Sequence, residues 1–253
     1  MSSFDRLAIA YDNAIDWESR LSREIPFIES YLPRDRPGNV LDLACGSGRH
    51  LVRLGEINHN GLGIDHSSDM IRAARALAMK RGVDVLFEIK DMRDLESVVS
   101  DTFDTVLCLG NSLAQLPTLE DVRQVLSIAA RRLRSGGHII LQTLNFEEIR
   151  RSGFRFFPLR EGRLEDGRTV VFVRFFEHDP DRPMSTLVMA GLVGSNVEWS
   201  AITSTQQVLN LDMPILKGAL NVVGFSDIRF FGNYDWSEFN PERHRSMVCV
   251  ASH

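Results

Sequence analysis

The stretch "VLDLACGSGRH", residues 40–50, combines an apolar run, one acid and two glycines within eleven positions. The run "VLDLA" has the length and composition of a buried β-strand, and it leads directly to Gly46 and Gly48. Glycine adopts backbone conformations that other residues avoid, and its missing side chain lets a ligand approach the main chain. We therefore predict a ligand-binding turn at the end of a buried strand.

Outward from this stretch, short β-like runs alternate with helical runs as far as residue 144. The expected strands are residues 39–44, 61–65, 84–89, 103–109 and 138–144. The expected helices are residues 48–57, 67–82 and 118–137, the second capped by Ser67 or Ser68 and the third ending on two glycines. Apolar strands separated by helices predict a parallel sheet covered on both faces, with ligands bound beyond the carboxyl ends of the strands.

The pattern changes in the second half of the chain. Residues 154–209 are β-rich without helical runs between the strands, which predicts an antiparallel insertion. A helix near 213–223 and two strands, at 225–232 and 246–252, then return to the sheet. The loop between these two strands is too short for a crossover helix, so we expect them to pair antiparallel.

Composition excludes several classes of protein. The 253 residues include 29 Lys and Arg against 34 Asp and Glu, with basic residues scattered, so no surface for DNA or RNA is evident. No apolar stretch approaches the roughly 20 residues that span a bilayer, and "MSSFDRLAIAYDN" lacks the pattern of a secretory signal. We expect a cytoplasmic protein without membrane or nucleic-acid partners. Its three cysteines, Cys45, Cys108 and Cys249, are expected to be buried thiols.

Two kinds of nucleotide ligand suit the glycine turn. Dinucleotide enzymes use GxGxxG to place a pyrophosphate on a helix N-terminus, but here the third glycine position is Leu51. Asp65, at the end of the next expected strand, is placed to accept hydrogen bonds from two ribose hydroxyls of either ligand. The discriminating features are Asp42 and the polar segments "KDMRDL" and "CLGNSLAQLP" after the third and fourth strands.

Taken in order, "VLDLACGSG", "GID", "KDMRDL" and "FDTVLCLGNSLAQLP" resemble the motifs of class I S-adenosylmethionine-dependent methyltransferases, and "CLGNS" is similar to the glycine N-methyltransferase group. The resemblance implies a Rossmann-like α/β fold, with five parallel strands and an antiparallel closing pair. It also implies S-adenosyl-L-methionine as cofactor and S-adenosyl-L-homocysteine as product. The expected parts are an N-terminal helical cap (1–36), a cofactor-binding core (37–153), an insertion covering the active site (154–212) and a C-terminal part completing the sheet (213–253).

The same resemblance assigns cofactor contacts. It implies that the methionine part lies on the backbone of Ala44 and Gly46, that Asp42 braces the turn, that Asp65 holds the ribose and that Asp91 holds the adenine amino group. The full set that we expect to bind the cofactor is Tyr11, Trp17, Arg20, Ala44, Gly46, Gly48, Asp65, His66, Met70, Asp91, Met92 and Leu109. In this set Tyr11 and Trp17 cap the adenosine, Arg20 pairs with the cofactor carboxylate, and Met92 and Leu109 contribute backbone groups.

The acceptor end is predicted to be lined by amides. Asn111, Gln115 and Asn145 are our candidate catalytic residues because they follow the fourth and fifth expected strands. Neither strand end has a DPPY-like motif or the acidic cluster of metal-dependent O-methyltransferases. An amine needs only to arrive unprotonated, whereas a hydroxyl usually needs a base or a metal. We therefore predict methyl transfer to a small polar acceptor at an amine nitrogen, by an enzyme that forms a homodimer.

Alternatives remain at this stage. The chain also fits a methyltransferase acting on tRNA or protein, or a binding protein that senses S-adenosylmethionine. Asp91, Asn111 and Asn145 are residue types that cap helices and turns. The glycine N-methyltransferase group has an arginine after the fifth strand that grips the substrate carboxylate, and this sequence has Leu144 there. Its substitutes in the insertion, unranked by sequence, are Arg155, Arg174 and His178.

Overall fold

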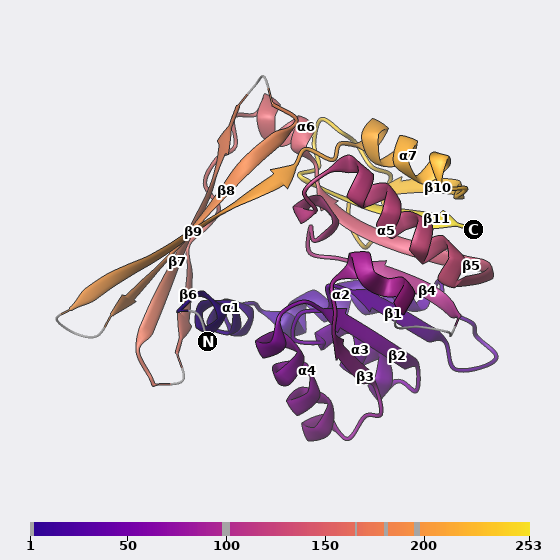
Figure 1. Ribbon diagram of the computed structural model, residues 1–253, viewed down its shortest axis with the longest axis horizontal. Coiled ribbons are helices and arrows are strands. Elements are labelled where there is room, and N and C mark those ends of the chain that lie inside the picture. The colour runs from indigo at the N-terminus through magenta and orange to yellow at the C-terminus, as the bar shows by residue number, and fades with distance from the viewer. Residues whose placement is uncertain (1–2, 98–101, 165, 180–181, 195–197) are drawn as a thin grey trace.

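The computed structural model describes residues 3–97, 102–164, 166–179, 182–194 and 198–253, with the backbone alone described for residues 3–6 and 96–97. A seven-stranded sheet forms the centre, and a four-stranded sheet projects from one side of it (Figure 1). The central strands are β1 (Asn39–Leu43), β2 (Asn60–Asp65), β3 (Leu86–Ile89), β4 (Phe103–Cys108), β5 (Leu133–Leu144), β10 (Ser226–Phe231) and β11 (Ser246–Ser252).

The central sheet has the strand order β10-β11-β5-β4-β1-β2-β3. The strands β1 to β5 are parallel to one another, whereas β11 is antiparallel to both of its neighbours, β5 and β10. This arrangement confirms the expected α/β fold and its antiparallel closing pair. The strands β1 and β4 are neighbours, but the chain continues from β1 to β2 on one side and from β4 to β5 on the other. The carboxyl ends of β1 and β4 therefore form the switch point at which such sheets bind ligands.

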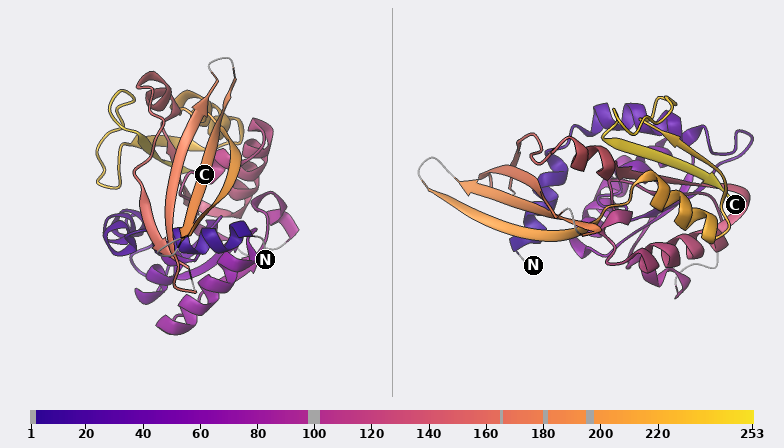
Figure 2. Two further views of the ribbon diagram at one scale, coloured as in Figure 1. Left: turned by 90° about the vertical axis from the view of Figure 1, so that its left-hand side faces the viewer. Right: turned by 90° about the horizontal axis from the view of Figure 1, so that it is seen from above.

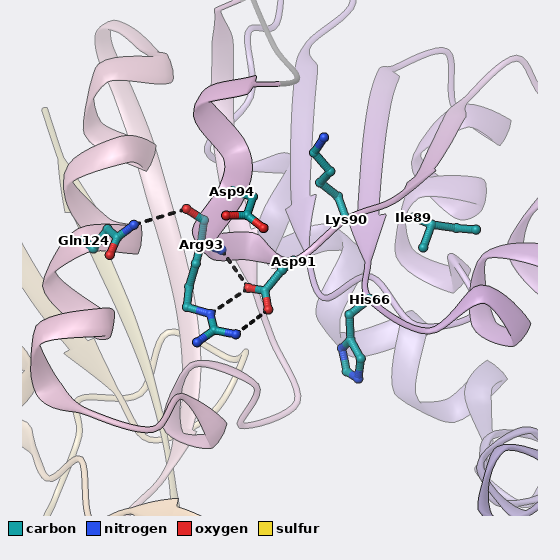
Figure 3. Close-up of a pocket in the computed structure, with 7 residues that line it drawn as sticks. All are labelled: His66, Ile89, Lys90, Asp91, Arg93, Asp94 and Gln124. Atoms are coloured by element: carbon teal, nitrogen blue, oxygen red, sulfur yellow. Dashed lines mark hydrogen bonds and ion pairs between the residues drawn. The ribbon is translucent and has the colours of Figure 1, made fainter. Parts of the chain in front are cut away.

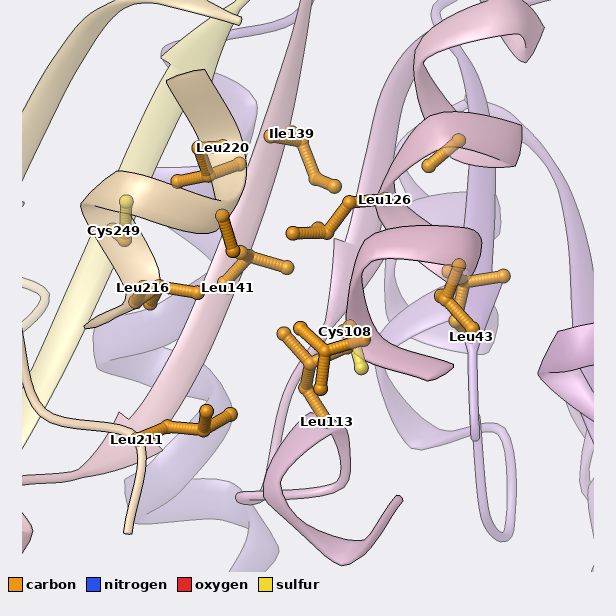
Figure 4. Packing of buried hydrophobic residues seen from close by; sticks show 14 of the residues in the cluster. Leu43, Cys108, Leu113, Leu126, Ile139, Leu141, Leu211, Leu216, Leu220 and Cys249 are labelled. Carbon is orange, nitrogen blue, oxygen red and sulfur yellow. The ribbon is translucent and has the colours of Figure 1, made fainter. Parts of the chain in front are cut away.

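Helices cover both faces of this sheet. Alternate residues of β11 show the two faces: Met247 and Cys249 join one buried cluster and Val248 and Val250 the other. The first cluster includes residues of α5 (Leu119–Arg132) and α7 (Met213–Val222), as Figure 4 shows. The second includes residues of α2 (Trp17–Glu29), α3 (Arg49–Glu56) and α4 (Ser68–Arg81). Strands buried on both sides read as continuous apolar runs, which explains the sequence pattern.

Helix boundaries follow the capping residues in one case and not in another. The hydroxyl of Ser67 accepts the Met70 N–H, and Gly82 ends α4 in the left-handed conformation. The expected end of α5 on two glycines is wrong, because the helix ends at Arg132. Leu133 is instead extended, buried and paired with β4, and Arg134 forms an ion pair with Asp104. Tertiary contacts thus override helix propensity there.

The insertion folds as an antiparallel sheet of β6 (Arg160–Arg163), β7 (Thr169–His178), β8 (Met184–Gly194) and β9 (Trp199–Leu209). It follows the short helix α6 (Phe146–Arg151). The N-terminal helix α1 (Ser3–Asn13) lies against this sheet (Figures 1 and 2), where Leu7 and Ala10 pack on Phe172. A Cβ at Gly191 would lie 2.9 Å from the Leu7 side chain, so glycine permits this close approach.

Two further observations concern the whole fold. Cys45, Cys108 and Cys249 are buried and free, as expected, and burial raises the pKa of each thiol. Within the described ranges, no helix has both the length and the apolar character needed to cross a membrane.

Candidate active site

The turn after β1 has the geometry of a ligand cradle. Ala44, Gly46 and Gly48 all have positive φ, at 56°, 56° and 71°. A non-glycine residue in this conformation costs about 1–2 kcal/mol, so the strain at Ala44 supports the predicted ligand-binding turn. A Cβ at Gly46 would meet no atom within 4 Å, whereas a Cβ at Gly48 would lie 2.5 Å from the Phe87 ring. Gly46 therefore leaves open space beside the backbone, and Gly48 permits packing against β3.

Asp65 braces this turn and keeps spare hydrogen-bonding capacity. Its Oδ2 accepts the Gly46 N–H at 2.9 Å, and its Oδ1 accepts the Ser67 N–H at 2.8 Å. The residue is only 8% exposed. Each oxygen of an ionised carboxylate has two acceptor positions, so one position on each remains for a vicinal diol such as that of a ribose. His66 follows with its side chain exposed, and its Nδ1 lies 3.7 Å from Asp65 Oδ1.

Asp42 does not brace the turn as expected, because that hydrogen bond comes from Asp65. Asp42 is 2% exposed, and its Oδ2 has no hydrogen-bond partner among the described residues. Burial raises its pKa to about 7, and the charge of His50 opposes this rise. Buried polar atoms are rarely left unpaired, so this one indicates a polar ligand or water beside the turn.

A buried ionic network lies next to Asp42. Glu24 of α2 contacts His50 Nε2 through Oε2 at 2.5 Å and Arg20 Nε through Oε1 at 2.8 Å. Burial favours a higher pKa for Glu24, but the hydrogen bond and charge of His50, followed by those of Arg20, hold the pKa below its usual value. The charge of Arg20 also opposes the rise in the pKa of Asp42, and its expected pairing with the cofactor carboxylate stays a prediction. The Tyr234 hydroxyl, buried beside this network, has no hydrogen-bond partner in the described structure.

The N-terminal segment also contacts the turn, which the sequence did not reveal. Asp12 Oδ2 accepts hydrogen bonds from the Ser47 hydroxyl at 2.7 Å and from Arg49 at 3.2 Å. Its carbonyl accepts the Trp17 indole N–H at 2.9 Å. The sequence around Asp12, "YDN", does not predict this contact, because Asp12 and Ser47 lie far apart in the sequence. The contact fastens α1 to the cradle.

Tyr11 and Trp17 have other partners than the expected adenosine. The Tyr11 ring packs edge-on against Phe172 of the insertion, with ring centroids 5.2 Å apart. The Trp17 ring packs against His50, and Arg20 lies over it at 4.8 Å. Neither aromatic residue lines the cleft beside Asp91. We therefore leave both out of the proposed adenosine contacts.

A cleft of about 570 Å³ lies beyond β2 and β3, at the place expected for a purine. Its lining residues, drawn in Figure 3, are His66, Ile89, Lys90, Asp91, Arg93, Asp94 and Gln124. The Asp91 carboxylate accepts the Arg93 backbone N–H at 2.9 Å, which is the capping role left open by the sequence. It also pairs with the Arg93 guanidinium, which lowers the pKa of Asp91. Asp91 is thus an ionised acceptor at this end of the site.

Two methionines of the predicted set lie near this cleft without lining it. Met70 is half-buried in the first turn of α4, where its N–H is capped by Ser67. Met92 is half-buried at the start of the 3₁₀ helix η1 (Met92–Ser97) and packs against the main core. Their roles toward a cofactor stay predictions.

The ends of β4 and β5 are joined by polar contacts. Asn111 has φ 64°, and its Oδ1 accepts the Leu144 N–H at 2.9 Å. Its N–H donates to the Gln142 carbonyl at 3.1 Å. No contact of its side-chain NH₂ group occurs within the described part of the chain, which leaves a donor at the strand end. The Leu109 carbonyl accepts the Ser112 hydroxyl at 2.7 Å, so a ligand would share it with that side chain.

The other two candidate catalytic amides are already engaged. Gln115, in the 3₁₀ helix η2 (Leu113–Gln115), accepts at Oε1 from Gln206 of β9 at 2.8 Å and so joins the insertion to the core. Asn145 is 1% exposed and caps α6, accepting the Glu148 N–H. Its NH₂ donates to the carbonyls of Pro241 and His244 at 2.9 and 2.7 Å. These bonds use both donors of the buried Asn145 NH₂ group, so the structure offers no geometric support for its expected catalytic role.

Comparison with known proteins identifies the family of the chain. Residues 40–137 match the methyltransferase domain family. A glycine/sarcosine N-methyltransferase from Aphanothece halophytica is 32% identical over 229 residues, which cover 88% of this chain and 80% of the relative. These matches, with the fold, define the chain as a member of the class I S-adenosylmethionine-dependent methyltransferases. Within this class it is similar to the glycine/sarcosine N-methyltransferases.

Solved structures show the same fold. An S-adenosylmethionine-dependent methyltransferase from Clostridium acetobutylicum ATCC 824 superposes with a TM-score of 0.78 at 15% identity, covering 99% of both chains. An amino pentose methyltransferase from Micromonospora echinaspora, solved with S-adenosylmethionine bound, superposes with a TM-score of 0.70 at 21% identity, covering 97% of this chain and 95% of that one. These structures show the shared fold, which agrees with the family membership given above, by which the enzyme is a methyltransferase that uses S-adenosylmethionine.

The residues at the turn fit this cofactor. The open space at Gly46 accommodates a ligand against the backbone, and the spare acceptor positions of Asp65 suit a ribose. The unpaired Asp42 Oδ2 and the nearby Arg20 suit the ammonium and carboxylate groups of an amino acid. A pyrophosphate would instead meet several carboxylates at this turn, which argues against a dinucleotide.

Proposed function

We propose that this enzyme transfers a methyl group from S-adenosylmethionine to the amine nitrogen of a small polar acceptor. The carrying observation is the absence of a general base from the segments that follow β4 and end β5. Residues 109–116 and 142–146, which follow β4 and end β5, contain amides, hydroxyls and apolar groups but no carboxylate, histidine or lysine. A hydroxyl acceptor needs a base at this place, whereas an amine needs only to bind in its unprotonated form.

The cofactor supplies an electrophilic methyl group on a sulfonium when it is bound. The chain's part is to bind, orient and exclude water. In the proposed site Gly46, Asp65 and Asp91 hold the cofactor, and the NH₂ group of Asn111 donates to a polar group of the acceptor. Orientation of two reactants can supply on the order of 7–11 kcal/mol of the barrier, so catalysis here needs no nucleophilic side chain.

The insertion and α1 form the proposed cover of the acceptor site. Two contacts support this role: Gln206 of the insertion meets Gln115 after β4, and Asp12 of α1 meets Ser47 in the turn. A cover held at both the cofactor turn and the acceptor end keeps bulk water from the reacting atoms. Exclusion of water strengthens the electrostatic contacts inside such a site.

The proposal is tested with paired acceptors that differ in the reacting atom. Purified enzyme and S-adenosylmethionine are offered amines, such as glycine, sarcosine and free amino sugars, beside the corresponding hydroxy compounds. We expect S-adenosylhomocysteine release with amines alone, and a product whose new methyl carbons have the NMR shifts of N-methyl groups. Methyl transfer to oxygen or carbon would refute the assignment of the acceptor atom.

A further inference from the structure

One face of β7 points toward the acceptor end of the site. Phe172, Arg174 and Phe176 alternate along the strand and so share that face. Phe172 and Phe176 are both buried. The first packs on Tyr11 of α1, and the second packs on Phe146, which directly follows the end of β5, with ring centroids 5.7 Å apart. Arg174 therefore lies between the helix that contacts the cofactor turn and the carboxyl end of β5.

The register of the insertion supports the same orientation. Leu187 of β8 pairs with Phe176 on one side and with Gln206 on the other, and directly paired residues lie on one face. Gln206 contacts Gln115 after β4. The face that carries Arg174 is consequently the face that meets the core at the acceptor end.

Arg174 lacks a counter-ion in this position. Its guanidinium lies 4.7 Å from the Tyr11 ring centroid and 4.5 Å from that of Phe157. Its buried Nε has no hydrogen-bond partner, and within the described ranges no carboxylate pairs with it. Burial lowers the pKa of Arg174; Tyr11 opposes this effect, and the positive charge of Arg160 adds to it. An unpaired, partly desolvated cation is costly unless an anion is present in the working state.

The other two basic side chains considered in the insertion are satisfied within it. Arg155 pairs with Glu177. His178 contacts the Ser185 hydroxyl through Nδ1 at 2.9 Å and a backbone carbonyl through Nε2 at 3.0 Å. The structure thus ranks three candidates that the sequence left equal. Of the three, Arg174 is the one for which no polar partner is found among the described residues.

We propose that Arg174 binds an anionic group of the methyl acceptor, so that substrates are amines that also carry a carboxylate or phosphate. This inference rests on the proposed function and names its substrate class. A guanidinium presents a planar set of donors that matches either anion, and the NH₂ group of Asn111 at the end of β4 is a further donor for the same acceptor. The acceptor class comprises two sources of the anion: an amino acid, or a nucleotide-linked amino sugar.

Binding to the enzyme saturated with S-adenosylhomocysteine tests the inference without turnover. Calorimetry compares glycine with glycinamide, sarcosine with sarcosinamide, and a nucleoside-diphosphate amino sugar with the free amino sugar. We expect at least one anionic member to bind tenfold or more tightly than its neutral partner, and the pair that responds identifies the source of the anion. Equal binding within every pair, or no binding by any anionic member, would overturn the inference.

Two arginine variants then locate the anion. Arg174→Gln is expected to raise the dissociation constant and KM of the anionic acceptor at least tenfold, to change kcat less, and to leave S-adenosylhomocysteine affinity within about twofold. Arg174→Lys should restore part of the affinity because it keeps the charge. Arg155→Gln is the matched control, since that arginine also lies over a phenylalanine ring but is paired with Glu177. Equal effects of the two glutamine variants would contradict the role of Arg174.

The outcomes also separate this inference from the proposed function. If the enzyme methylates neutral amines and Arg174→Gln does not affect that reaction, the proposed anion site is refuted and N-methyl transfer is supported. If the enzyme instead methylates the oxygen of an anionic compound and Arg174→Gln weakens that reaction, the anion site is supported and N-methyl transfer is refuted.

Discussion

The Asp65 carboxylate accepts the Gly46 N–H at 2.9 Å, which connects the end of β2 with the turn after β1. The two residues are neighbours because β1 and β2 pair in parallel and end together. One carboxylate therefore fixes the backbone of the cofactor cradle and keeps acceptor positions for the ligand. Asp65 performs both roles at the carboxyl edge of the sheet, where this fold binds its ligands.

Replacement of Asp65 should weaken cofactor binding. Asp65→Ala removes two bonds to a ribose and the brace on Gly46, so we expect S-adenosylhomocysteine affinity to fall at least tenfold, about 1.4 kcal/mol or more, by calorimetry. Glu88→Gln, which removes an exposed acid from the adjacent strand β3, is the control and should bind normally. Unchanged affinity in a folded Asp65→Ala protein would contradict the pocket assignment.

The two glycines of the turn should respond differently to alanine. Gly46→Ala meets no neighbouring atom, so it should cost about 1 kcal/mol of unfolding free energy through its positive φ, yet block the ligand. Gly48→Ala drives a methyl group into Phe87 and should cost about 3 kcal/mol.

Urea denaturation of the apo proteins and titration with S-adenosylhomocysteine measure these two effects separately. The assignment predicts that the variant with the larger loss of stability is Gly48→Ala and that the variant with the larger loss of affinity is Gly46→Ala. The opposite order would mean that Gly46 has a purely structural role.

Substitution of Asn111 should affect turnover more than cofactor binding. Because its φ is positive, Asn111→Gly removes the amide without adding backbone strain, and Asn111→Asp keeps Oδ1 while removing the NH₂ donor. We expect either variant to lower kcat/KM for the acceptor about tenfold or more, with S-adenosylhomocysteine affinity within about twofold of normal. Parallel losses in both quantities would instead indicate that Asn111 only joins β4 to β5.

Stability should depend on pH through Asp42. Burial raises its pKa to about 7, above the usual 3.8, so between these values the folded state binds more protons than the unfolded state. Its contribution to the free energy of unfolding therefore falls by up to about 1.4 kcal/mol per pH unit as pH rises from about 4 to about 7, and is constant above that range.

Asp42→Asn removes this proton linkage. Relative to wild type, the apo variant should gain stability from pH 5 to about pH 7 in urea denaturation, and the difference should then level off up to pH 8. A difference between the two proteins that is the same at both ends of this range would show that Asp42 does not titrate near neutrality.

Sequence predicted the features that depend on local pattern. Gly46 and Gly48 follow an apolar strand directly, and Asp65 ends the next strand, so their meeting follows from the parallel pairing alone. The closing pair was predictable because the short loop before Ser246 leaves no room for a crossover helix. These inferences needed only periodicity, turn residues and strand order.

Contacts between distant segments were beyond such reasoning. Asp12 meets Ser47, and Tyr11 meets Phe172 of the insertion, because α1 folds back between the two sheets. The sequence around Asp12 and Tyr11 does not distinguish either residue from a surface residue. The ranking of Arg174 above Arg155 likewise required the structure, since it depends on which arginine finds a carboxylate.

The insertion leaves the core after β5 and returns before α7 as one unbroken excursion of the chain. Under the proposed function, exchange of this single stretch between relatives is expected to change the acceptor preference and to leave the nucleoside site intact. Compatibility of such a chimera would depend on the packing of the insertion on the core, as in the Phe146–Phe176 contact, and on the Gln115–Gln206 pair. The architecture thus separates the evolution of acceptor choice from that of cofactor use.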